Sequence, residues 1–294
     1  MILAYAKINL SLRVLYRRAD GFHELRSIFQ TISLADRIGF ACQPARHTRI
    51  DLDDGGLNLP DNLMRRAADR YLEAAQKKAV VKMSLEKRIP MGGGLGGGST
   101  DAAAVLLAMQ RALPSRRLDL MEIAASLGSD VPFFLEGGTA LGVSRGEDLY
   151  PLPDLQATWG VVVAPDVHVS TPQAYQALGR AELTSPQPSR ILRKFQALSR
   201  SVAACEPRSV WQGLCENDFE AAVFLQYPVL KQFRDKLERL GAQPARLTGS
   251  GAALFGLFPS RTNAIEVAKK LSQSCRAYPV SLISRRRYRA QWQA

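Results

Sequence analysis

The sequence predicts an α+β fold with two domains, and three observations lead to that prediction. Segments whose apolar residues recur at every second position, as in strands, are mixed along the chain with segments of helical spacing. The two kinds do not alternate regularly as strand, helix and strand, which argues against a doubly wound parallel sheet. The 294 residues, 46% of them apolar, exceed the usual size of one domain and supply a sizeable core.

The first strand is predicted from residues 2 to 16, which alternate between apolar and more polar side chains. Period two is typical of a half-buried strand, so we expect one face to be exposed. Lys7 and Asn9 lie two positions apart and therefore point the same way. Asp20-Gly21 then predicts a turn.

The remaining elements follow from helical spacing, alternation, and the Gly and Pro residues that begin or end segments. The first domain, residues 1–158, is predicted to contain a helix over 62–76, a strand over 80–87, the glycine loop 92–98, a helix capped by Ser99 or Thr100, a helix over 120–127 that stops at Gly128, and strands over 131–135 and 139–143. The second domain, residues 159–294, is predicted to contain a strand over 159–164, a loop over 184–189, a helix from Pro228, two strands within 245–258, a helix over 264–271 and a strand over 280–283.

Composition excludes several classes of protein. No run of eighteen apolar residues occurs, so we expect no membrane span. The first residues carry no basic leader, and Lys7 interrupts their apolar stretch, so we expect no signal peptide. The four cysteines form neither a zinc motif nor a disulfide framework, which predicts a reducing compartment and a cytoplasmic protein. They are Cys42, Cys205, Cys215 and Cys275.

The net charge of +12 is compatible with a solvated basic surface, a site for an anionic small molecule, or a surface for nucleic acid. The densest basic run is Arg285, Arg286, Arg287 and Arg289, close to the C-terminus. Because Tyr288 is the one aromatic residue within it, this run favours neither class of ligand.

The glycine loop is the strongest local signal for chemistry, because six of the seven residues from Gly92 to Gly98 are glycine. Without side chains, backbone N–H groups can close on an anion, and the following helix directs its dipole and free N–H groups to the same place. A flexible linker is the alternative, but predicted elements flank the loop closely on both sides. We therefore predict that the loop and its neighbours bind the phosphates of ATP. These residues are Pro90, Met91, Gly92, Gly93, Gly94, Leu95, Gly96, Gly97, Gly98, Ser99 and Thr100.

Two better-known phosphate loops do not fit this segment. It matches G-x-G-x-x-G, but Pro90 separates the glycines from the preceding strand, and no acidic residue ends a second strand as a dinucleotide-binding fold requires. The G-K-[ST] of a Walker loop is also missing.

Asp130 precedes an apolar segment, so it is predicted to lie at the edge of a core. It is either a turn-forming residue or a general base that accepts a hydroxyl proton. Lys7 is the candidate cation beside it, or else an exposed strand residue. The third segment, Leu247 to Ala252, is either a tight hairpin or a second approach of backbone to ligand.

Taken together and in this order, the three segments resemble the GHMP kinase superfamily, named for galactokinase, homoserine, mevalonate and phosphomevalonate kinases. The resemblance covers nearly the whole chain. The segments A-K-I-N-L at 6–10, R-A-D-G-F-H-E-L at 18–25 and N-D-F-E at 217–220 resemble one branch of that superfamily. The D-G-F-H-E-L part is specific, because the other GHMP kinases lack it.

The resemblance implies a first domain like domain 2 of ribosomal protein S5 and a ferredoxin-like second domain. It implies phosphorylation, by ATP with Mg²⁺, of a tertiary hydroxyl on a small molecule that carries a cytidine diphosphate group, on the non-mevalonate route to isoprenoid precursors. The catalytic pair falls on Lys7 and Asp130. The other implied positions are Phe22 and Tyr175 for the two faces of cytosine, His23 for its edge, Asn9 near the reacting hydroxyl, Thr171 as a further substrate contact, and Asn62 and Lys87 on the adenine side.

The departures from the pattern are small. Phe22 stands where tyrosine is common and Ser129 where alanine is common, and neither removes a required group. The resemblance does not assign the metal ligands, for which Ser99 and Thr100 are candidates.

Two alternatives remain at this point. The first is a GHMP kinase for another alcohol, against which Phe22, His23 and Tyr175 argue. The second is a nucleic-acid-binding protein that uses the basic surface, with the glycine loop as a spacer.

Overall fold

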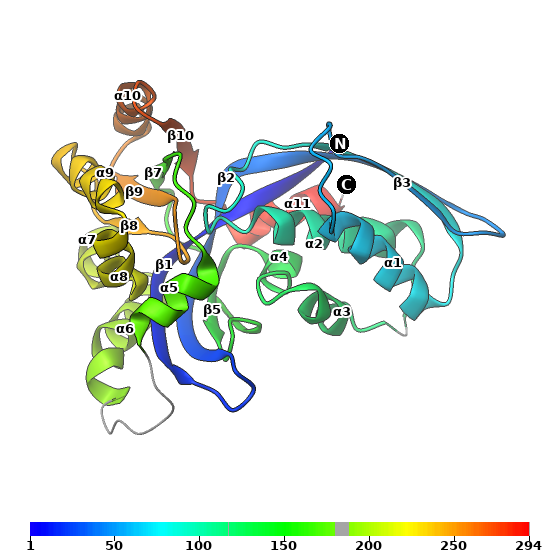
Figure 1. The fold of residues 1–294 in the computed structure, drawn as a ribbon, viewed down its shortest axis with the longest axis horizontal. Coiled ribbons are helices and arrows are strands. Elements are labelled where there is room, and N and C mark those ends of the chain that lie inside the picture. The colour runs from blue at the N-terminus through cyan, green and yellow to red at the C-terminus, as the bar shows by residue number, and fades with distance from the viewer. Residues whose placement is uncertain (117, 180–187, 294) are drawn as a thin grey trace.

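The structure, a computed structural model, describes residues 1–116, 118–179 and 188–293. It contains two β-sheets, each covered by helices, so the predicted α+β class is confirmed (Figure 1). The first sheet uses strands up to residue 152 and the second uses strands from residue 159 onward. No helix within the described ranges is long and apolar enough to cross a bilayer.

The first sheet has six strands in the order β3-β4-β2-β5-β6, with β1 paired to β2. Its strands are β1 (Ile2–Arg17), β2 (His23–Pro44), β3 (Arg49–Asp53), β4 (Ala79–Glu86), β5 (Thr139–Val143) and β6 (Asp148–Leu152). Helices α1 (Leu63–Ala75), α2 (Gly97–Ala112), α3 (Leu120–Leu127) and α4 (Phe133–Glu136) lie on one side of this sheet (Figure 1). Their apolar sides and the sheet enclose the first core, in which Tyr71 and Phe134 are among the largest buried side chains.

The second sheet has four antiparallel strands in the order β10-β7-β9-β8. They are β7 (Trp159–Ala164), β8 (Ala245–Leu247), β9 (Leu254–Phe258) and β10 (Arg276–Ser281). Counted from its own first strand, the order is 4-1-3-2, and the intervening helices make it the expected ferredoxin-like arrangement. The helices are α5 (Thr171–Leu178), α6 (Pro188–Ala203), α7 (Arg208–Trp211), α8 (Phe219–Gln226), α9 (Pro228–Arg239) and α10 (Arg261–Leu271).

A second core joins the two sheets. The apolar face of β1, with Ile8 and Leu10, packs against Val162 and Phe255 of the second sheet. The prediction that β1 is half-buried is therefore wrong, because its polar face is covered as well. The Lys7 side chain, which belongs to that face, is only 4% exposed. Both faces are buried since β1 lies between the second sheet and the helices of the first.

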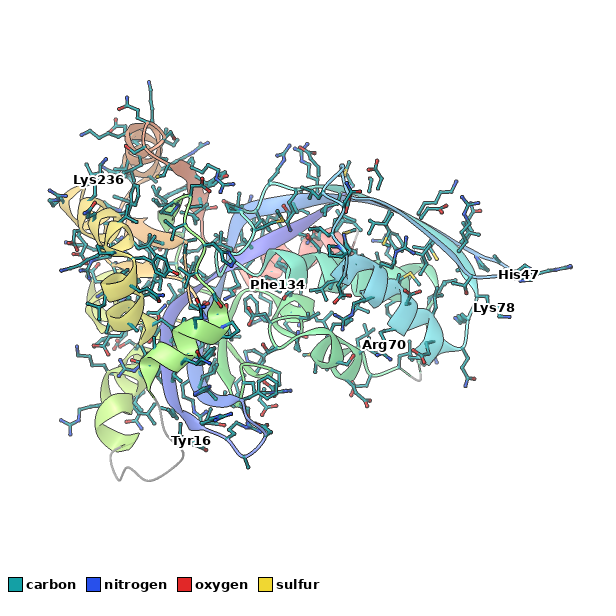
Figure 2. The ribbon with its side chains drawn as sticks, viewed as in Figure 1. Tyr16, His47, Arg70, Lys78, Phe134 and Lys236 are labelled. Atoms are coloured by element: carbon teal, nitrogen blue, oxygen red, sulfur yellow. The ribbon has the colours of Figure 1, made fainter. Side chains whose placement is uncertain are left out.

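The last helix, α11 (Arg285–Gln293), follows the second sheet in sequence but returns to the first. Figure 1 shows its end near the N-terminus, and the backbone N–H of Leu3 donates a hydrogen bond to Gln291 Oε1 at 3.2 Å. In Figure 2 the side chains of His47, Lys78 and Lys236 lie at the extremities of the molecule, whereas Phe134 lies near its centre.

Several predicted elements are confirmed at close to their predicted bounds, among them β1, α1, β4, α3, β5, β7, α9 and α10. The predicted strand over 131–135 is wrong, because Phe133 to Glu136 form the short helix α4. A short run of apolar residues does not distinguish a strand from a buried helix, and Pro132 and Gly137 limit this one to a single turn.

The cap predicted for α2 is also wrong. The helix begins at Gly97 after an N-cap at Gly96, so Ser99 and Thr100 lie in its first turn. Glycine at the N-cap is compatible with this start because φ is +72° there, a value that glycine adopts without strain. The predicted loop over 184–189 falls on residues 184–187, outside the described ranges, and on Pro188 and Ser189, which begin α6.

Candidate active site

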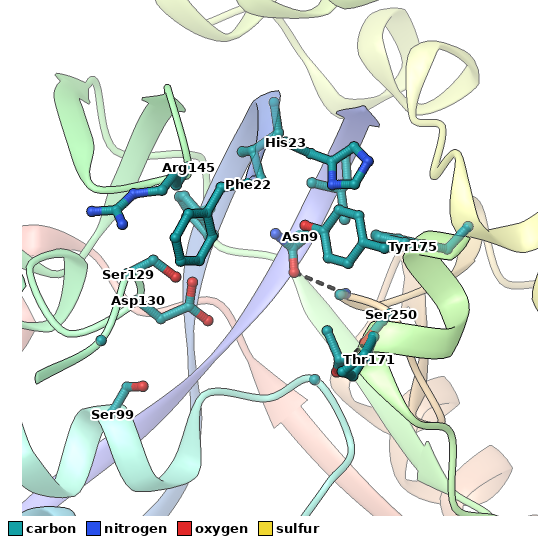
Figure 3. Close-up of a pocket in the computed structure, with 18 of the residues that line it drawn as sticks. Asn9, Phe22, His23, Ser99, Ser129, Asp130, Arg145, Thr171, Tyr175 and Ser250 are labelled. Carbon is teal, nitrogen blue, oxygen red and sulfur yellow. Dashed lines mark hydrogen bonds between the residues drawn. The ribbon is translucent and has the colours of Figure 1, made fainter. Parts of the chain in front are cut away.

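A cavity of ≈ 930 Å³ lies between the two sheets and is lined by residues from both (Figure 3). The first sheet and its loops contribute Lys7, Asn9, Phe22, His23, Gly94, Ser99 and Asp130. The helices and loops of the second sheet contribute Thr171, Tyr175, Gly249 and Ser250. The fold therefore gathers around one space residues that are far apart in the sequence, such as Asn9 and Gly249, which lie 240 positions apart.

Lys7 and Asp130 form an ion pair at the centre of this cavity, with Nζ 3.3 Å from Asp130 Oδ2. The lysine is buried, and its Nζ donates to Asn9 Oδ1 at 2.8 Å and lies 5.5 Å from the centre of the Phe29 ring. The aspartate side chain is 31% exposed. A fixed ammonium beside a carboxylate that solvent can reach is an arrangement that stabilises negative charge and accepts a proton at adjacent points.

Asn9 connects β1 to the glycine hairpin of the second sheet. Its Oδ1 accepts from the N–H of Gly249 at 2.9 Å, and its Nδ2 donates to Ser27 Oγ at 2.7 Å. The Thr248 hydroxyl accepts from the Asn9 N–H at 3.1 Å. The segment Leu247 to Ala252 is a tight turn between β8 and β9, and its Gly249 and Ser250 line the cavity, whereas its approach to a ligand stays a prediction.

The glycine loop approaches the same hairpin so closely that side chains are excluded. A Cβ added at Gly94 would lie 2.3 Å from the carbonyl oxygen of Thr248, and one added at Gly249 would lie 3.1 Å from Gly94 Cα. A Cβ at Gly96 would lie 2.7 Å from the Phe134 ring. These three glycines therefore have packing reasons for lacking a side chain, apart from any approach to phosphate.

The loop nevertheless has the character of an anion cradle. Gly92, Gly94 and Gly96 have positive φ angles, and in the described chain none of the N–H groups from Gly94 to Ser99 donates a hydrogen bond to a protein acceptor. These free N–H groups stand at the N-terminus of α2, a helix of sixteen residues, where the dipole also favours negative charge.

The other end of the cavity is aromatic. Figure 3 shows Phe22 and Tyr175 on opposite sides of it, with His23 over the Tyr175 ring. The His23 and Tyr175 ring centres are 4.7 Å apart with an angle of 22° between planes. Phe22 is 54% exposed, and the Arg145 guanidinium lies 4.8 Å from its ring centre. A slot between flat rings with a polar edge suits a planar base.

Two titratable groups at this end have shifted pKa values. Burial, and then the positive charge of Arg17, lower the pKa of His23, so the imidazole is neutral at pH 7. Burial, and then the carboxylate of Asp130, raise the pKa of Tyr175 to about 12, so its phenol remains protonated. Both groups can therefore donate a hydrogen bond without carrying charge at neutral pH.

Of the residues predicted to bind ATP, only Gly94 and Ser99 line the cavity, and the other residues of the loop, Asn62 and Lys87 lie outside its lining. Asn62 caps α1, with its Oδ1 accepting from the N–H of Met64 at 2.9 Å, while its buried Nδ2 has no partner. Lys87 Nζ is held between Asp36 at 2.6 Å and Asp101 at 2.7 Å, beneath the start of α2. Burial, opposed by the Lys87 ammonium, raises the pKa of the Asp101 carboxyl to about 7.

Other residues of the site were not predicted from the sequence. Arg17 and Arg145 add positive charge near the aromatic slot, but single arginines within a strand or turn give no local signal. The N-D-F-E segment at 217–220 contacts two parts of the cavity wall, the glycine hairpin and Tyr175. Asn217 Nδ2 donates to the carbonyls of Leu247 and Gly249 at 2.8 and 2.9 Å, and the Phe219 ring meets Tyr175 edge-on.

A helix start with free N–H groups, an ammonium–carboxylate pair and a slot between aromatic rings around one cavity are the arrangement expected of a small-molecule kinase. Two family models match the chain, GHMP kinases N terminal domain over residues 62–138 and GHMP kinases C terminal over 206–277. The first range contains both the glycine loop and Asp130.

Individual relatives give a finer comparison. The 4-diphosphocytidyl-2-C-methyl-D-erythritol kinase of Solibacter usitatus is 50% identical and covers 98% of this chain and 90% of its own. The enzyme of the same name from Thermus thermophilus is 40% identical, with 95% of each chain covered. A crystal structure of 4-(cytidine 5'-diphospho)-2C-methyl-D-erythritol kinase, 38% identical, superposes with a TM-score of 0.79 over 96% of this chain and 98% of its own.

A homoserine kinase from Cytophaga hutchinsonii shares the fold at 20% identity, with a TM-score of 0.74 and 95% of each chain covered. The chain therefore belongs to the GHMP kinases and, within them, to the family of 4-diphosphocytidyl-2-C-methyl-D-erythritol kinases.

Proposed function

We propose that the protein transfers the γ-phosphoryl group of ATP to the 2-hydroxyl of 4-diphosphocytidyl-2-C-methyl-D-erythritol, a step of the non-mevalonate route to isoprenoid precursors. The observation that carries this proposal is the Lys7–Asp130 pair, 3.3 Å apart in one cavity with the glycine loop and the aromatic slot. The 50% identity with an enzyme of that name supports the choice of substrate.

In the proposed mechanism Asp130 accepts the proton of the attacking hydroxyl, and Lys7 stabilises the negative charge that develops on the transferred group. Because Lys7 is buried and donates to Asn9, its ammonium is fixed in place before the substrates bind. Asn9 Nδ2 donates a hydrogen bond to Ser27, and Asn9 Oδ1 accepts hydrogen bonds from Lys7 and Gly249. Because both ends of the amide are engaged, Asn9 acts mainly by fixing Lys7 near the reacting hydroxyl.

The N–H groups between Gly94 and Ser99 would receive the β- and γ-phosphates of ATP. Magnesium, when bound, would neutralise phosphate charge there. Among the described residues no cluster of three His, Cys, Asp or Glu side chains is available for a metal. Asp130 and Ser99 line the cavity, which fits an ion held mainly by phosphates and water with one or two protein oxygens.

The aromatic slot would hold cytosine. Phe22 and Tyr175 supply the two faces, His23 supplies hydrogen bonds at the edge, and Thr171 lies on the same wall. In the arrangement described here His23 stacks on Tyr175, so the imidazole has to turn aside when a base enters. Arg17 and Arg145 offer positive charge to a diphosphate linked to that base.

The adenine side is proposed at Asn62 and Lys87. The unpartnered Nδ2 of Asn62 is a donor available to a ligand, whereas Lys87 is engaged with two carboxylates and supports the helix start. We assign residues 1–158 to ATP binding and residues 159–294 to the second half of the kinase. The free cysteines fit an enzyme of the cytoplasm.

The two alternatives have less support. Another alcohol would not use the slot formed by Phe22, His23 and Tyr175. A nucleic-acid surface built on the C-terminal arginines is disfavoured because Arg285 and Arg289 are engaged within the chain.

A coupled assay of ADP release tests the proposal. We expect turnover with 4-diphosphocytidyl-2-C-methyl-D-erythritol and very little with homoserine, mevalonate or methylerythritol phosphate lacking cytidine, because unpaired polar groups in the slot would reject them. Equal turnover of mevalonate would overturn the choice of substrate, and no turnover of any of them would overturn the kinase assignment.

A further inference from the structure

Helix α11 contains the arginine run from Arg285 to Arg289, and the proposed reaction assigns no role to these residues. Two glycines with positive φ, Gly137 and Gly138, allow it to approach the segment after Asp130. A Cβ at Gly137 would lie 2.3 Å from the Tyr288 ring, and one at Gly138 would lie 2.6 Å from Arg285 Cβ. The helix and this segment are therefore in direct contact along both glycines.

Side chains of α11 also hold the carbonyl groups of that segment. The Tyr288 side chain is 1% exposed, and its hydroxyl donates a hydrogen bond to the Phe134 carbonyl. Arg285 Nη2 donates to the Thr139 carbonyl at 2.5 Å and Nη1 to the Leu152 carbonyl at 3.0 Å, and Arg289 pairs with Glu136.

The segment held in this way contacts the catalytic pair and the glycine loop. The Phe133 ring lies 5.2 Å from Phe29, whose own ring lies 5.5 Å from Lys7 Nζ. The Phe134 ring occupies the space beside Gly96, where an added Cβ would also meet Lys7 Cγ at 3.2 Å. Asp130 precedes these two rings by three and four positions, so a displacement of Phe134 would move the carboxylate relative to the ammonium.

We propose that Tyr288 and Arg285 of helix α11 are positioning residues, which fix the segment from Val131 to Thr139 and through it the distance between Lys7 and Asp130. This inference rests on the proposed catalytic role of Asp130. Misplacing a reacting group by a fraction of an ångström lowers the rate with little effect on binding, because the binding contacts lie elsewhere.

The test removes a single atom from the contact. Tyr288→Phe keeps the buried ring and deletes the hydroxyl that holds Phe134. We expect kcat to fall by roughly tenfold while both KM values stay within about twofold of the parent. Arg287→Ala is the matched control, since Arg287 is exposed on the same helix, and its kcat should equal that of the parent. All rates are measured well below each variant's melting temperature.

A double-mutant cycle shows whether the effect acts through the catalytic pair. In the Asp130→Asn background, Tyr288→Phe should change the residual kcat by less than about twofold, because the group that it positions has lost its function. A full tenfold loss in that background overturns the proposal, and so does an unchanged kcat in the otherwise native protein. If Tyr288→Phe does not fold, Arg285→Lys replaces it under the same criteria. Full activity of Asp130→Asn alone would instead refute the catalytic role of Asp130, so the two failures are distinguishable.

Discussion

Replacing Asp130 by asparagine separates catalysis from folding more sharply than any other change at the site. The substitution is nearly isosteric and removes the negative charge and the proton-accepting capacity at Oδ2. Lys7 Nζ loses a partner at 3.3 Å but keeps Asn9 Oδ1 at 2.8 Å, so the buried ammonium is not left without an acceptor.

The two expected effects differ greatly in size. Since the Asp130 side chain is 31% exposed, loss of the ion pair should lower the free energy of unfolding by about 1 kcal/mol or less. Loss of a general base should lower kcat by roughly a hundredfold to ten-thousandfold. That corresponds to about 3–5 kcal/mol in the activation barrier. ATP affinity should change little, because the N–H groups of the glycine loop are untouched.

Steady-state kinetics of ADP release and thermal unfolding measure these two quantities. Asp69→Asn is a matched control, since Asp69 is exposed on α1 far from the cavity lining, and it should leave kcat unchanged. If Asp130→Asn retains kcat within about threefold of the parent, the carboxylate is not the general base and Asp130 only forms a turn.

The other predictions concern the cation, the loop and the aromatic slot. Lys7→Met should lower kcat by roughly a hundredfold or more, and an unchanged kcat would show that the ammonium does not act on the transferred group. Gly98→Val, at an exposed helical position whose new Cβ would meet Leu63 at an ordinary 3.4 Å, should raise the ATP dissociation constant at least about tenfold in calorimetry without loss of fold. Phe22→Ala and Tyr175→Ala should each weaken substrate binding by about 1–3 kcal/mol and leave ATP affinity as it is; the reverse pattern would mean that the slot holds the other ligand. The pKa of His23 is lowered in the folded protein, so the unfolded chain takes up more protons as pH falls below about 6.5, and the free energy of unfolding should decrease there. His23→Gln should lack that part of the pH dependence in denaturant titrations.

At the glycine loop, the sequence and the structure favour different positions for a test of phosphate binding. The sequence predicts that the loop and its neighbours form a phosphate site, and on that basis Gly94 and Gly96 are equally good targets for substitution. The structure shows that side chains there would collide with the Thr248 backbone and with Phe134, so a loss of ATP binding would not be informative. Local pattern does not show contacts between residues that are far apart in the sequence, and Gly98 becomes the useful target for that reason.

The sequence by itself predicted the fold class and most helices and strands, which the structure confirms, and it supplied the candidate catalytic residues. Periodicity is a local property, and the side chains of Lys7, Asn9 and Asp130 carry the same chemistry wherever they lie. Local pattern failed over 131–135, where a short apolar run fits a strand and a buried helix equally well.

Only the tertiary structure decided how those residues meet. It buried the polar face of β1, which alternation alone predicted to be exposed, and it set Lys7 3.3 Å from Asp130. It also returned α11 from the second sheet to the first, so that Tyr288 holds the segment behind the aspartate. Such contacts depend on packing between elements far apart in the chain, and packing is settled by the whole fold and not by neighbouring residues.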